Sequence, residues 1–439
     1  GVVNVTDLSV LATNWGRTSA THAQGDANSD GTINIYDLSI LASQWGQVIS
    51  SGQPPNSINI KDYGATGDGV TNDVSAFNSA LAQAHQTGKT LYVPAGSFLL
   101  SSQVLVPDGV NIIGTGESSW LMGPIKYGSN ETWTNLRIGA RFAAAARNSD
   151  GAHDTTFQTV RFSGGGGQNG SNGSSNVGFG GPDGSLTNIS FTDCKFDATF
   201  TQPNGDTTGD NVISIGEEDT SHVQNLSFTR CIIGSSNGTR TGSPRMGIEA
   251  LSRSPDHYLS GLQIIDSTFE PTDETALDIE SSPDAPPMTD MLIQGNLIKG
   301  GNPSFASPQY QQSICLEIGG GVQILNNTIW GSKWAAIEVY DRSGGLYPSH
   351  VTIANNTIDA TQGVPPAQWA VHLDASQVTF TGNTMRYNGD QIYGISIEAG
   401  SGNVVTGNSL THVGGSSDTA IVEINGASGN NISGNSVSP

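Results

Sequence analysis

Val322-Gln-Ile-Leu-Asn-Asn327 is followed 29 residues later by Val351-Thr-Ile-Ala-Asn-Asn356, and 27 residues after that by Val378-Thr-Phe-Thr-Gly-Asn383. Each segment alternates apolar and polar residues and then reaches an Asn or Gly turn, which is the pattern of a half-buried strand followed by a bend. Comparable segments end at Cys194, Cys231, Ser267, Asn296, Asn408 and Asn435. The spacing of 25 to 37 residues between successive segments predicts a solenoid.

A single coil of this kind cannot bury its apolar face, whereas a stack of coils forms a continuous core. We therefore expect an all-β chain in which about nine or more coils form a parallel β-helix over residues 58–439. The recurrent asparagines are expected to stack at the bend, each amide bonding to the next coil. Cys194 and Cys231 share that register, which leaves open whether they form a disulfide.

The first 46 residues contain an internal duplication, because Asn4 to Gly16 recurs 30 positions later as Asn34 to Gly46. Each copy predicts one short helix. Oxygen-bearing side chains ahead of the second copy have the spacing of an EF-hand loop, with Gly31 at the sharp turn and Asp rather than Glu at the last position. The expected structural calcium ligands are Asp26, Asn28, Asp30, Thr32 and Asp37. A plain turn rich in Asp and Asn is the alternative.

Two such half-EF-hands in tandem, each with an Asp-Leu-Ser…Trp-Gly helix, resemble dockerin modules, which attach enzymes to cohesin-bearing scaffolds. The resemblance covers residues 1–46 and implies an α-helical calcium-binding module that docks to a cohesin-like protein or a neighbouring subunit, near Ser9 and Ser39. The first copy begins at loop position 6, so the first repeat is either truncated or incomplete as a calcium site. Residues 47–57 combine Pro-Pro with Gly and Ser, which predicts a linker.

Three recognisable segments follow the linker. They are Asp62-Tyr-Gly-Ala-Thr-Gly-Asp-Gly-Val-Thr-Asn-Asp73, a helix-like stretch from Ala76 to Ala84, and Leu91-Tyr-Val-Pro-Ala-Gly96. In this order they resemble the opening of the pectate-lyase superfamily of right-handed parallel β-helices. That superfamily includes polygalacturonase-like hydrolases, lyases and phage tailspikes. The resemblance covers residues 58–116 and implies the fold, but it does not imply one reaction, because members with different activities share this opening.

Acidic residues recur on a second strand of successive coils, in Gly247-Ile-Glu249, Ala276-Leu-Asp278, Cys315-Leu-Glu317 and Ala336-Ile-Glu338. If the aliphatic residues face inward, these carboxylates point outward as one ladder. Neighbouring strands lie about 4.8 Å apart, so the carboxylates should raise one another's pKa. The expected catalytic residues are therefore Glu249, Asp278, Glu317 and Glu338. A bound cation and a merely solvated strand face are the alternatives.

The spacing of the ladder suits glycoside chemistry, since carboxyls of retaining enzymes lie roughly 5 to 5.5 Å apart and those of inverting enzymes roughly 6.5 to 9.5 Å. Flat rings near these strands are suited to stacking on sugar faces, although an aromatic cover over the solenoid is an equal alternative for each ring. The expected substrate-binding residues are Trp334, Tyr340, Arg342, Trp369 and His372, the last also a candidate extension of the ladder.

The motifs of polygalacturonase-like hydrolases are mostly missing, and Gly209-Asp210-Asn211 matches their Asp-Asp segment only loosely. The region around the ladder is acidic and poor in lysine, which favours a neutral glycan over a polyuronate and hydrolysis over elimination. We therefore expect a glycoside hydrolase that cleaves a polysaccharide by carboxylate acid and base catalysis. A polysaccharide lyase and a non-catalytic structural, adhesive or glycan-binding protein are the alternatives.

The formal net charge of the 439 residues is −22, which disfavours nucleic acid and anionic membranes as partners. No apolar run reaches the roughly 18 residues that a membrane-spanning helix needs, so membrane insertion is not expected. The chain starts at Gly1 without a signal-like segment, which is typical of a processed protein. A secreted or surface-associated protein is expected, and the dockerin resemblance implies a bacterial source.

Overall fold

The computed structural model forms two compact units, Gly1–Asn59 and Ile60–Pro439. None of the helices in the described ranges is both long enough and apolar enough to cross a membrane. The described residues are 5–21, 24–28, 30–43, 53–139, 142–144, 151–163, 177–179, 185–197, 211–216, 222–235, 246–252, 254–272, 274–300, 312–317, 320–330, 334–341, 350–361, 369–388, 393–414 and 419–439.

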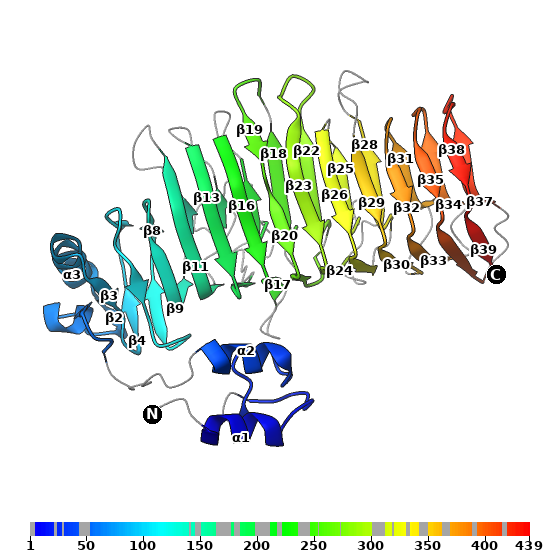
Figure 1. The fold of residues 1–439 in the computed structure, drawn as a ribbon. Helices are drawn as coiled ribbons and strands as arrows, with labels where there is room; N and C mark the ends of the chain where they lie inside the picture. Colours follow the sequence, from blue (N-terminus) through cyan, green and yellow to red (C-terminus); the bar gives the residue numbers. More distant parts are fainter. Residues whose placement is uncertain are drawn as a thin grey trace. The chain divides into compact units, whose positions relative to one another are not determined.

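The first unit contains α1 (Val5–Thr13) and α2 (Ile35–Ser43), one helix from each copy of the duplication (Figure 1). Leu11 of α1 is buried, and so is Ile33, which precedes α2. Gly25 has a φ of +102° and lies so close to Leu11 that an added Cβ would come within 2.8 Å of the leucine Cα. The buried apolar residues of this unit therefore come from α1 and from the residue two positions before α2, and Gly25 brings the intervening loop against α1.

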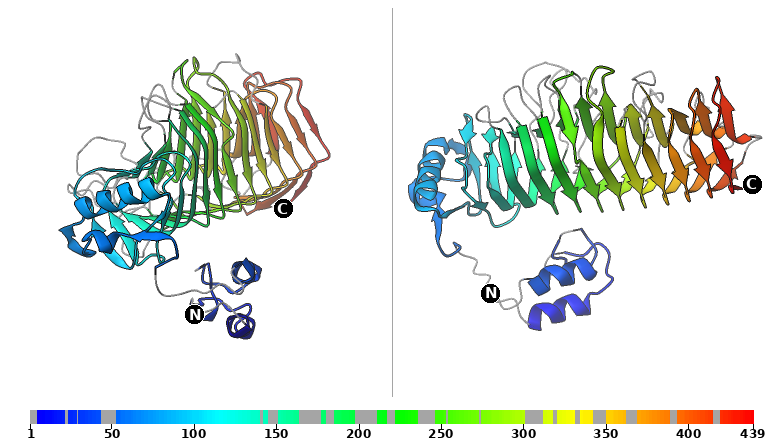
Figure 2. Two further views of the ribbon diagram at one scale, coloured as in Figure 1. Left: turned by 60° about the vertical axis from the view of Figure 1, so that its left-hand side comes forward. Right: turned by 45° about the horizontal axis from the view of Figure 1, so that its top comes forward.

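β1 (Ser57–Asn59) ends just before the second unit. The second unit then opens with a 3-10 turn (Ile60–Tyr63), followed by β2 (Asp68–Asn72) and α3 (Val74–Thr87). Phe77, Ala80, Leu81 and Ala84 of α3 are buried at helical spacing. Asp73 accepts hydrogen bonds from the backbone N–H groups of Thr66 and Gly67, at 2.7 and 3.2 Å. The helix predicted from this segment is confirmed, and it covers the first end of the coil stack (Figure 2).

Parallel strands stack into coils that belong to two sheets, a 27-stranded sheet and a 12-stranded sheet over the described residues. The larger sheet includes β1 and β2 and goes on with β3 (Thr90–Tyr92), β4 (Gly96–Leu99), β6 (Ile112–Ile113) and β7 (Ser119–Met122). It continues through β9 (Thr132–Gly139), β11 (Ala152–Ser163), β13 (Ser185–Thr192), β16 (His222–Thr229), β19 (Tyr258–Ser260), β20 (Gln263–Ile265), β23 (Met288–Gln294), β26 (Gly320–Leu325), β29 (Val351–Ala354), β32 (Thr379–Thr381), β35 (Val404–Thr406) and β38 (Asn431–Ser433).

Each coil then turns a corner and continues in the same sheet. The strands after the corner are β14 (Lys195–Asp197), β17 (Ile232–Ser235), β21 (Thr268–Phe269), β24 (Leu297–Lys299), β27 (Thr328–Trp330), β30 (Thr357–Ala360), β33 (Thr384–Asn388), β36 (Ser409–Val413) and β39 (Ser436–Ser438). The 12-stranded sheet consists of β5 (Val104–Leu105), β8 (Ile125–Lys126), β10 (Phe142–Ala144), β12 (Val177–Phe179), β15 (Ile213–Ile215), β18 (Ile248–Ser252), β22 (Leu277–Ser281), β25 (Ile314–Glu317), β28 (Ile337–Tyr340), β31 (Trp369–Asp374), β34 (Tyr393–Glu398) and β37 (Thr419–Ile424). This is the parallel β-helix that the repeat predicted.

The core consists of like residues stacked from coil to coil. Phe157, Phe191 and Phe228 are buried one above another, with ring centroids 4.7 and 5.1 Å apart. A second stack joins Phe162 and Phe196 at 4.9 Å. Because the strands are in register, each ring lies over its neighbour in the offset geometry that aromatic pairs favour.

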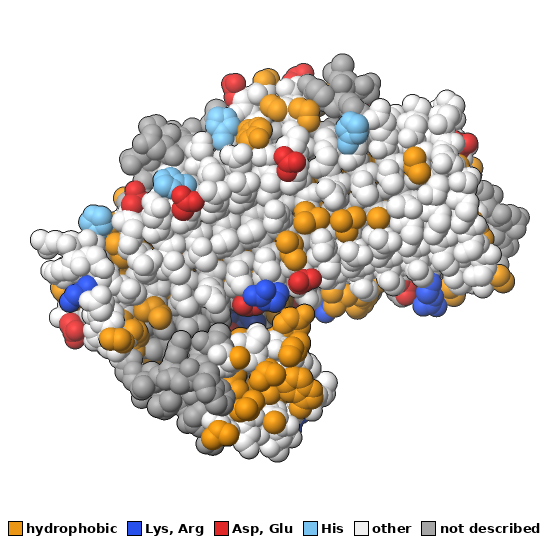
Figure 3. All heavy atoms as spheres, in the orientation of Figure 1, with side chains coloured by type: hydrophobic (Ala, Val, Ile, Leu, Met, Phe, Trp, Pro, Cys, Tyr) orange, Lys and Arg blue, Asp and Glu red, His pale blue; other side chains and the backbone are white. Residues whose placement is uncertain are grey.

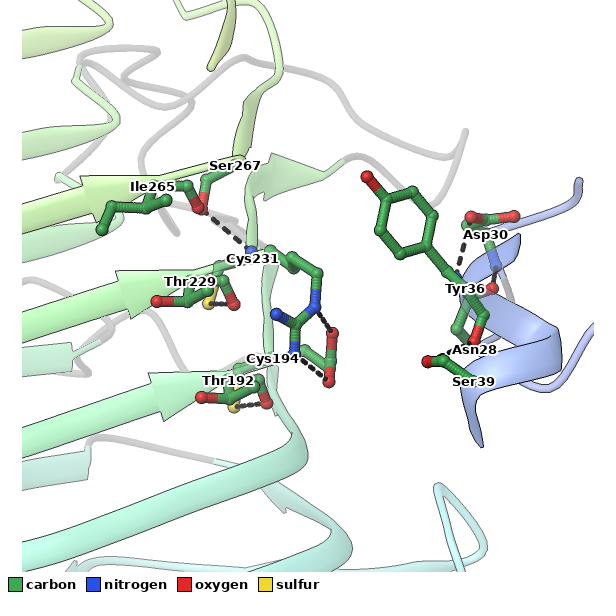
Figure 4. A network of polar contacts seen from close by, with 12 residues as sticks. Asn28, Asp30, Tyr36, Ser39, Thr192, Cys194, Thr229, Cys231, Ile265 and Ser267 are labelled. Atoms are coloured by element: carbon green, nitrogen blue, oxygen red, sulfur yellow. Dashed lines mark hydrogen bonds and ion pairs between the residues drawn. The ribbon is translucent and has the colours of Figure 1, made fainter. Parts of the chain in front are cut away.

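At the corner between the two strands that each coil contributes to the larger sheet, side chains stack from coil to coil as a ladder. The sequence predicted this stacking for the asparagines. At each step from Asn296 to Asn408 the backbone N–H donates to the side-chain Oδ1 of the next asparagine, at 2.8 to 2.9 Å. Three earlier coils use Cys194, Cys231 and Ser267 at the same place (Figure 4). The cysteine thiols donate to the carbonyls of Thr192 and Thr229, and both cysteines are buried and free.

Candidate active site on the 12-stranded sheet

The predicted carboxylates lie on the face of the 12-stranded sheet that points away from the core. Inward positions carry aliphatic residues such as Ile248, Leu277 and Ile314, so the positions between them face outward. The strand register places six neighbouring positions in one line, which we call the first outward row. Its members are Ser214, Glu249, Asp278, Cys315, Glu338 and His372.

The predicted ladder is wrong at Glu317. The register pairs Glu317 with Glu280 on one side and Tyr340 on the other, while Cys315 occupies the place between Asp278 and Glu338. The reason is that Ile314 aligns with the inward Ile337, so the residue opposite Glu338 is Cys315. Glu317 lies two residues further along the strand than the ladder required. A second outward row results, containing Glu280, Glu317, Tyr340 and Asp374.

Asp278 sits at the centre of the acidic cluster. Its side chain is buried, and its Oδ1 atom has no hydrogen-bond partner among the described residues. Burial raises the pKa of Asp278 well above its ordinary value, and the charges of Glu280, Glu317 and Glu249 raise it further. The carboxyl therefore retains its proton at a pH where an ordinary aspartate is ionised.

Glu338 is surrounded by hydrogen-bond donors. Gln312 donates through Nε2 to Glu338 Oε2 at 2.7 Å, and His372 Nδ1 lies 3.0 Å from Oε1. The Thr275 hydroxyl donates to Gln312 Oε1 at 3.1 Å, which orients the amide. Burial alone would raise the pKa of Glu338, but the hydrogen bonds from His372 and Gln312 outweigh it and lower the pKa below its ordinary value.

The same row therefore holds one carboxyl with a raised pKa and one with a lowered pKa, two coils apart. Two strand steps of about 4.8 Å place their backbone positions roughly 9 to 10 Å apart. That spacing lies near the upper end of the roughly 6.5 to 9.5 Å between the two carboxyls of an inverting glycosidase, which leaves room for a water molecule. Environments that push two pKa values apart are the physical basis for assigning an acid and a base.

The aromatic residues lie beside this row. Tyr340 is 41% exposed in the second outward row, between Glu317 and Asp374. The Trp369 ring stacks on His372, with centroids 4.1 Å apart, and Trp334 meets Trp369 edge to face at 6.2 Å.

The prediction that His372 binds substrate needs correction. The side chain is only 7% exposed, and both ring nitrogens contact carboxylates, so the imidazole is fully occupied within the protein. The ring contacts Glu338 and Glu398 instead. The predicted Arg342 lies outside the described residues.

Sequence reasoning missed several residues of the site, namely Asn211, Glu280, Gln312 and Glu398. Asn211 donates to Glu249, as Gln312 does to Glu338, and Glu398 Oε2 lies 2.9 Å from His372 Nε2. Asn211, Gln312 and Thr275 each stand three residues before a member of the first outward row. This recurrence of a polar residue three positions ahead of the row could have identified Asn211 and Gln312 from the sequence.

The loop with EF-hand spacing closes around its own carboxylates. Asp37 accepts backbone hydrogen bonds from Ala27 and Asn34 at 2.7 and 2.8 Å, and Asp26 accepts from Asp30 and Gly31 at 3.1 and 3.0 Å. Burial raises the pKa of Asp26, as do the charges of Asp30 and Asp37, although the backbone hydrogen bonds act in the opposite direction.

The donor chemistry of this loop fits calcium, which prefers carboxylate and carbonyl oxygens. Within the part of the chain that the structure describes, no three His, Cys, Asp or Glu side chains converge closely enough to hold a metal ion by themselves. A bound cation would therefore also need oxygens from Asn28 and Thr32. Calcium at this loop stays a prediction.

Hydrophobic side chains gather on the surface of the first unit over α1 and α2 (Figure 3). Val5 and Ile35 begin the two helices at equivalent places in the duplication and are 69% and 60% exposed. Trp15 and Tyr36 are also more than half exposed. Exposed apolar residues at this density in so small a unit are typical of a docking surface.

Two family models match the second unit and the residues just ahead of it. A model described as rhamnogalacturonase A/epimerase, pectate lyase-like, matches residues 57–249, and a model of the right-handed β-helix region matches residues 257–410. Both models describe β-helical families, and the first is similar to the family that the opening segment resembles.

Curated relatives share short segments with the chain. Mannuronan C5-epimerase AlgE1 of Azotobacter vinelandii is 41% identical over 89 residues, which is 18% of this chain and 6% of that protein. The pre-neck appendage protein of Bacillus phage phi29 is 38% identical over 60 residues, 14% of this chain and 7% of that protein. The chain thus covers less than a tenth of the length of these relatives.

Solved structures resemble the chain over most of its length at low identity. PfbA, a surface adhesin of Streptococcus pneumoniae, superposes with a TM-score of 0.55 at 14% identity, covering 82% of this chain and 91% of that one. Tailspike protein 3 of bacteriophage CBA120 superposes with a TM-score of 0.53 at 13% identity, covering 85% and 61%. These likenesses establish the fold alone, since β-helices carry many activities.

Proposed function

We propose that this chain is an extracellular glycoside hydrolase that cleaves a polysaccharide bound across the outward rows of the 12-stranded sheet. The observation that carries the proposal is the contrast between two carboxyls of one row. Asp278 is buried with one oxygen unpartnered, which raises its pKa, and Glu338 has hydrogen bonds on both oxygens, which lower its pKa. Asp278 is the general acid and Glu338 is the general base. The relative named as a mannuronan C5-epimerase supports a polysaccharide as substrate.

The geometry suggests how the reaction proceeds. The protonated Asp278 donates its proton to the glycosidic oxygen as the bond to the sugar breaks, and Glu338 takes a proton from the attacking water. Water attacks the face of the sugar opposite the leaving group, which inverts the anomeric centre. Gln312 and His372 bind the two Glu338 oxygens and keep the base in a fixed orientation toward that water.

The experiment is reducing-sugar release from a panel of neutral and uronic polysaccharides, with Asp278→Asn and Glu338→Gln beside the parent. Each substitution keeps the shape of the side chain and removes its proton chemistry, so we expect activity to fall by at least about 100-fold. Asp359→Asn is the matched control. Asp359 lies on β30 of the larger sheet, with an ion pair to Arg386 at 3.4 Å.

Other outcomes identify the alternatives. Products that absorb in the ultraviolet as unsaturated sugars would show a lyase. Equal activity of parent, Asp278→Asn and Glu338→Gln would remove both residues from the mechanism. Binding without turnover on every substrate would replace the enzyme with a glycan-binding or adhesive protein.

We also propose that the first unit is a dockerin-like module that docks the solenoid to a cohesin-like partner. The exposed residues Val5, Trp15, Ile35 and Tyr36 support this proposal. The test is calorimetric titration of the full chain with a cohesin panel in calcium. Ile35→Asp should weaken binding, while Val413→Asp, at an exposed apolar residue of β36, is the control. Binding that is equal in both variants would contradict the proposal.

A further inference from the structure

His372 lies between two carboxylates contributed by the coils on either side of its own. Its Nδ1 atom lies 3.0 Å from Glu338 Oε1, and its Nε2 atom lies 2.9 Å from Glu398 Oε2. A neutral imidazole carries a proton on one nitrogen only, whereas an imidazolium donates from both. Two carboxylate acceptors on opposite sides of the ring therefore favour the charged form.

The ring has little freedom to leave this position. Its side chain is 7% exposed, and the Trp369 ring covers one face at a centroid distance of 4.1 Å. Glu398 is itself held, because Asn425 of the next coil donates through Nδ2 to Glu398 Oε1. Asn425 has a φ of +52°, a backbone conformation that asparagine tolerates better than most residues.

We propose that His372 and Glu398 are positioning residues that hold Glu338 in its ionised form and in the orientation of a general base. This inference rests on the proposed function, since it assigns the device that serves the base of that reaction. Neither His372 nor Glu398 is asked to touch the substrate. Their effect passes through one hydrogen bond, from His372 Nδ1 to Glu338 Oε1.

The charges around the imidazole agree with this role. Glu338 faces the imidazole from β28, and Glu398 faces it from β34. Asp374 lies two residues from His372 on the same strand and is also close enough to Asp341 for their charges to repel. Burial alone would lower the pKa of His372, but its hydrogen bonds and charge attraction to Glu338 and Glu398 outweigh that effect and raise it. The cation is therefore retained above the pH at which an ordinary histidine loses its proton.

The variant Glu398→Gln separates charge from position. The glutamine amide can donate to Nε2, which leaves a neutral imidazole still able to donate from Nδ1 to Glu338. We expect the His372 imidazole to deprotonate at lower pH in this variant, as followed by nuclear magnetic resonance titration and assigned by comparison with His372→Gln. Glu423→Gln, at an exposed carboxylate on the neighbouring β37, should leave the titration unchanged.

Kinetics supply the second readout. In His372→Gln the acidic limb of the kcat profile should move to higher pH, because a neutral amide replaces the charged donor to Glu338. In His372→Gln kcat should fall by roughly 10- to 100-fold with little change in KM, which is the size of effect that outer-shell partners have at metal sites. An unchanged titration in Glu398→Gln, or an unchanged kcat profile in His372→Gln, would overturn the proposal.

The two readouts also separate this inference from the proposed function. If the parent hydrolyses nothing, the proposed function fails, while the titration still decides whether Glu398 holds the imidazole charged. If the parent is active and the titration does not respond to Glu398→Gln, the positioning inference fails alone.

Discussion

Asp278 and Glu338 face outward from the same row of the solenoid, two coils apart, and their surroundings shift their pKa values in opposite directions. Asp278 is buried among other carboxylates with one oxygen lacking a partner. Glu338 is less buried, with 16% of its side chain exposed, and it receives hydrogen bonds on both oxygens. The hydrogen bonds and the smaller burial of Glu338 together lower its pKa relative to that of Asp278.

Asp278→Asn should stabilise the protein at neutral pH while it abolishes activity. The pKa of Asp278 is raised by burial in the folded chain, so its favourable contribution to stability is complete at acid pH and is lost as the pH rises through the folded value. Asparagine avoids that loss, and we expect a gain of roughly 1 to 3 kcal/mol. Thermal unfolding at acid and neutral pH measures it.

The control for that measurement is its pH dependence. The difference between Asp278→Asn and the parent should shrink toward acid pH, where Asp278 is protonated in both folded and unfolded chains. A difference that stays constant with pH would mean that the substitution acts by packing and not by titration.

Catalysis should show a bell-shaped dependence on pH. The acidic limb reports protonation of Glu338, whose pKa is lowered by His372 and Gln312, and the alkaline limb reports deprotonation of Asp278, whose pKa is raised by burial. Gln312→Ala should move the acidic limb to higher pH, because one of the donors to Glu338 is gone. A Gln312→Ala profile that matches the parent would contradict the role given to this amide.

Tyr340→Ala should weaken substrate binding more than turnover. The ring is 41% exposed beside Glu317 and Asp374, where it can stack on a sugar face. Losing such a contact corresponds to about 1 kcal/mol, so we expect KM to rise roughly fivefold with kcat nearly unchanged. Tyr258→Ala, at a similarly exposed tyrosine on β19, should leave both constants as they are.

Asn327→Ala should destabilise the solenoid strongly. Asn327 Oδ1 accepts from the backbone N–H and the side-chain amide of Asn296, and its Nδ2 donates to the carbonyl of Ile293. Removing the amide leaves several buried groups unsatisfied, so we expect a loss of roughly 2 to 5 kcal/mol in urea denaturation. Asn431→Ala, at an exposed residue of β38, should change stability by less than about 0.5 kcal/mol.

Calcium should bind the full chain through the loop between α1 and α2, and isothermal calorimetry measures it. Combining Asp26→Asn with Asp37→Asn removes two expected ligands and should abolish the heat of binding. Asp62→Asn, at an exposed aspartate of the second unit, is the matched control. Binding that survives the double substitution would move the site elsewhere.

The repeat predicted the coils because both the alternation and the corner residue are local features of the chain. A corner asparagine such as Asn327 recurs with a fixed environment, so its role could be inferred from spacing alone. The two helices of the first unit were predictable for the same reason, since the duplication repeats their apolar positions.

The rows of the site were harder to predict, because register is decided between strands. Cys315-Leu-Glu317 was aligned by its carboxylate, whereas the aliphatic residue Ile314 decides the register against Ile337. The small residue before each inward aliphatic, Ser313 here and Ala336 in the next coil, marks the correct alignment. His372 was misjudged because a sequence does not show that two carboxylates occupy both of its nitrogens.

The corner ladder also has a direction. From Asn296 to Asn408, each asparagine donates its backbone N–H to the following coil and never to the preceding one. A stack cut off after any of these coils would therefore leave the backbone amide of its last corner asparagine without its acceptor. Every further coil supplies the acceptor for the coil before it, so the ladder is complete only where another coil follows.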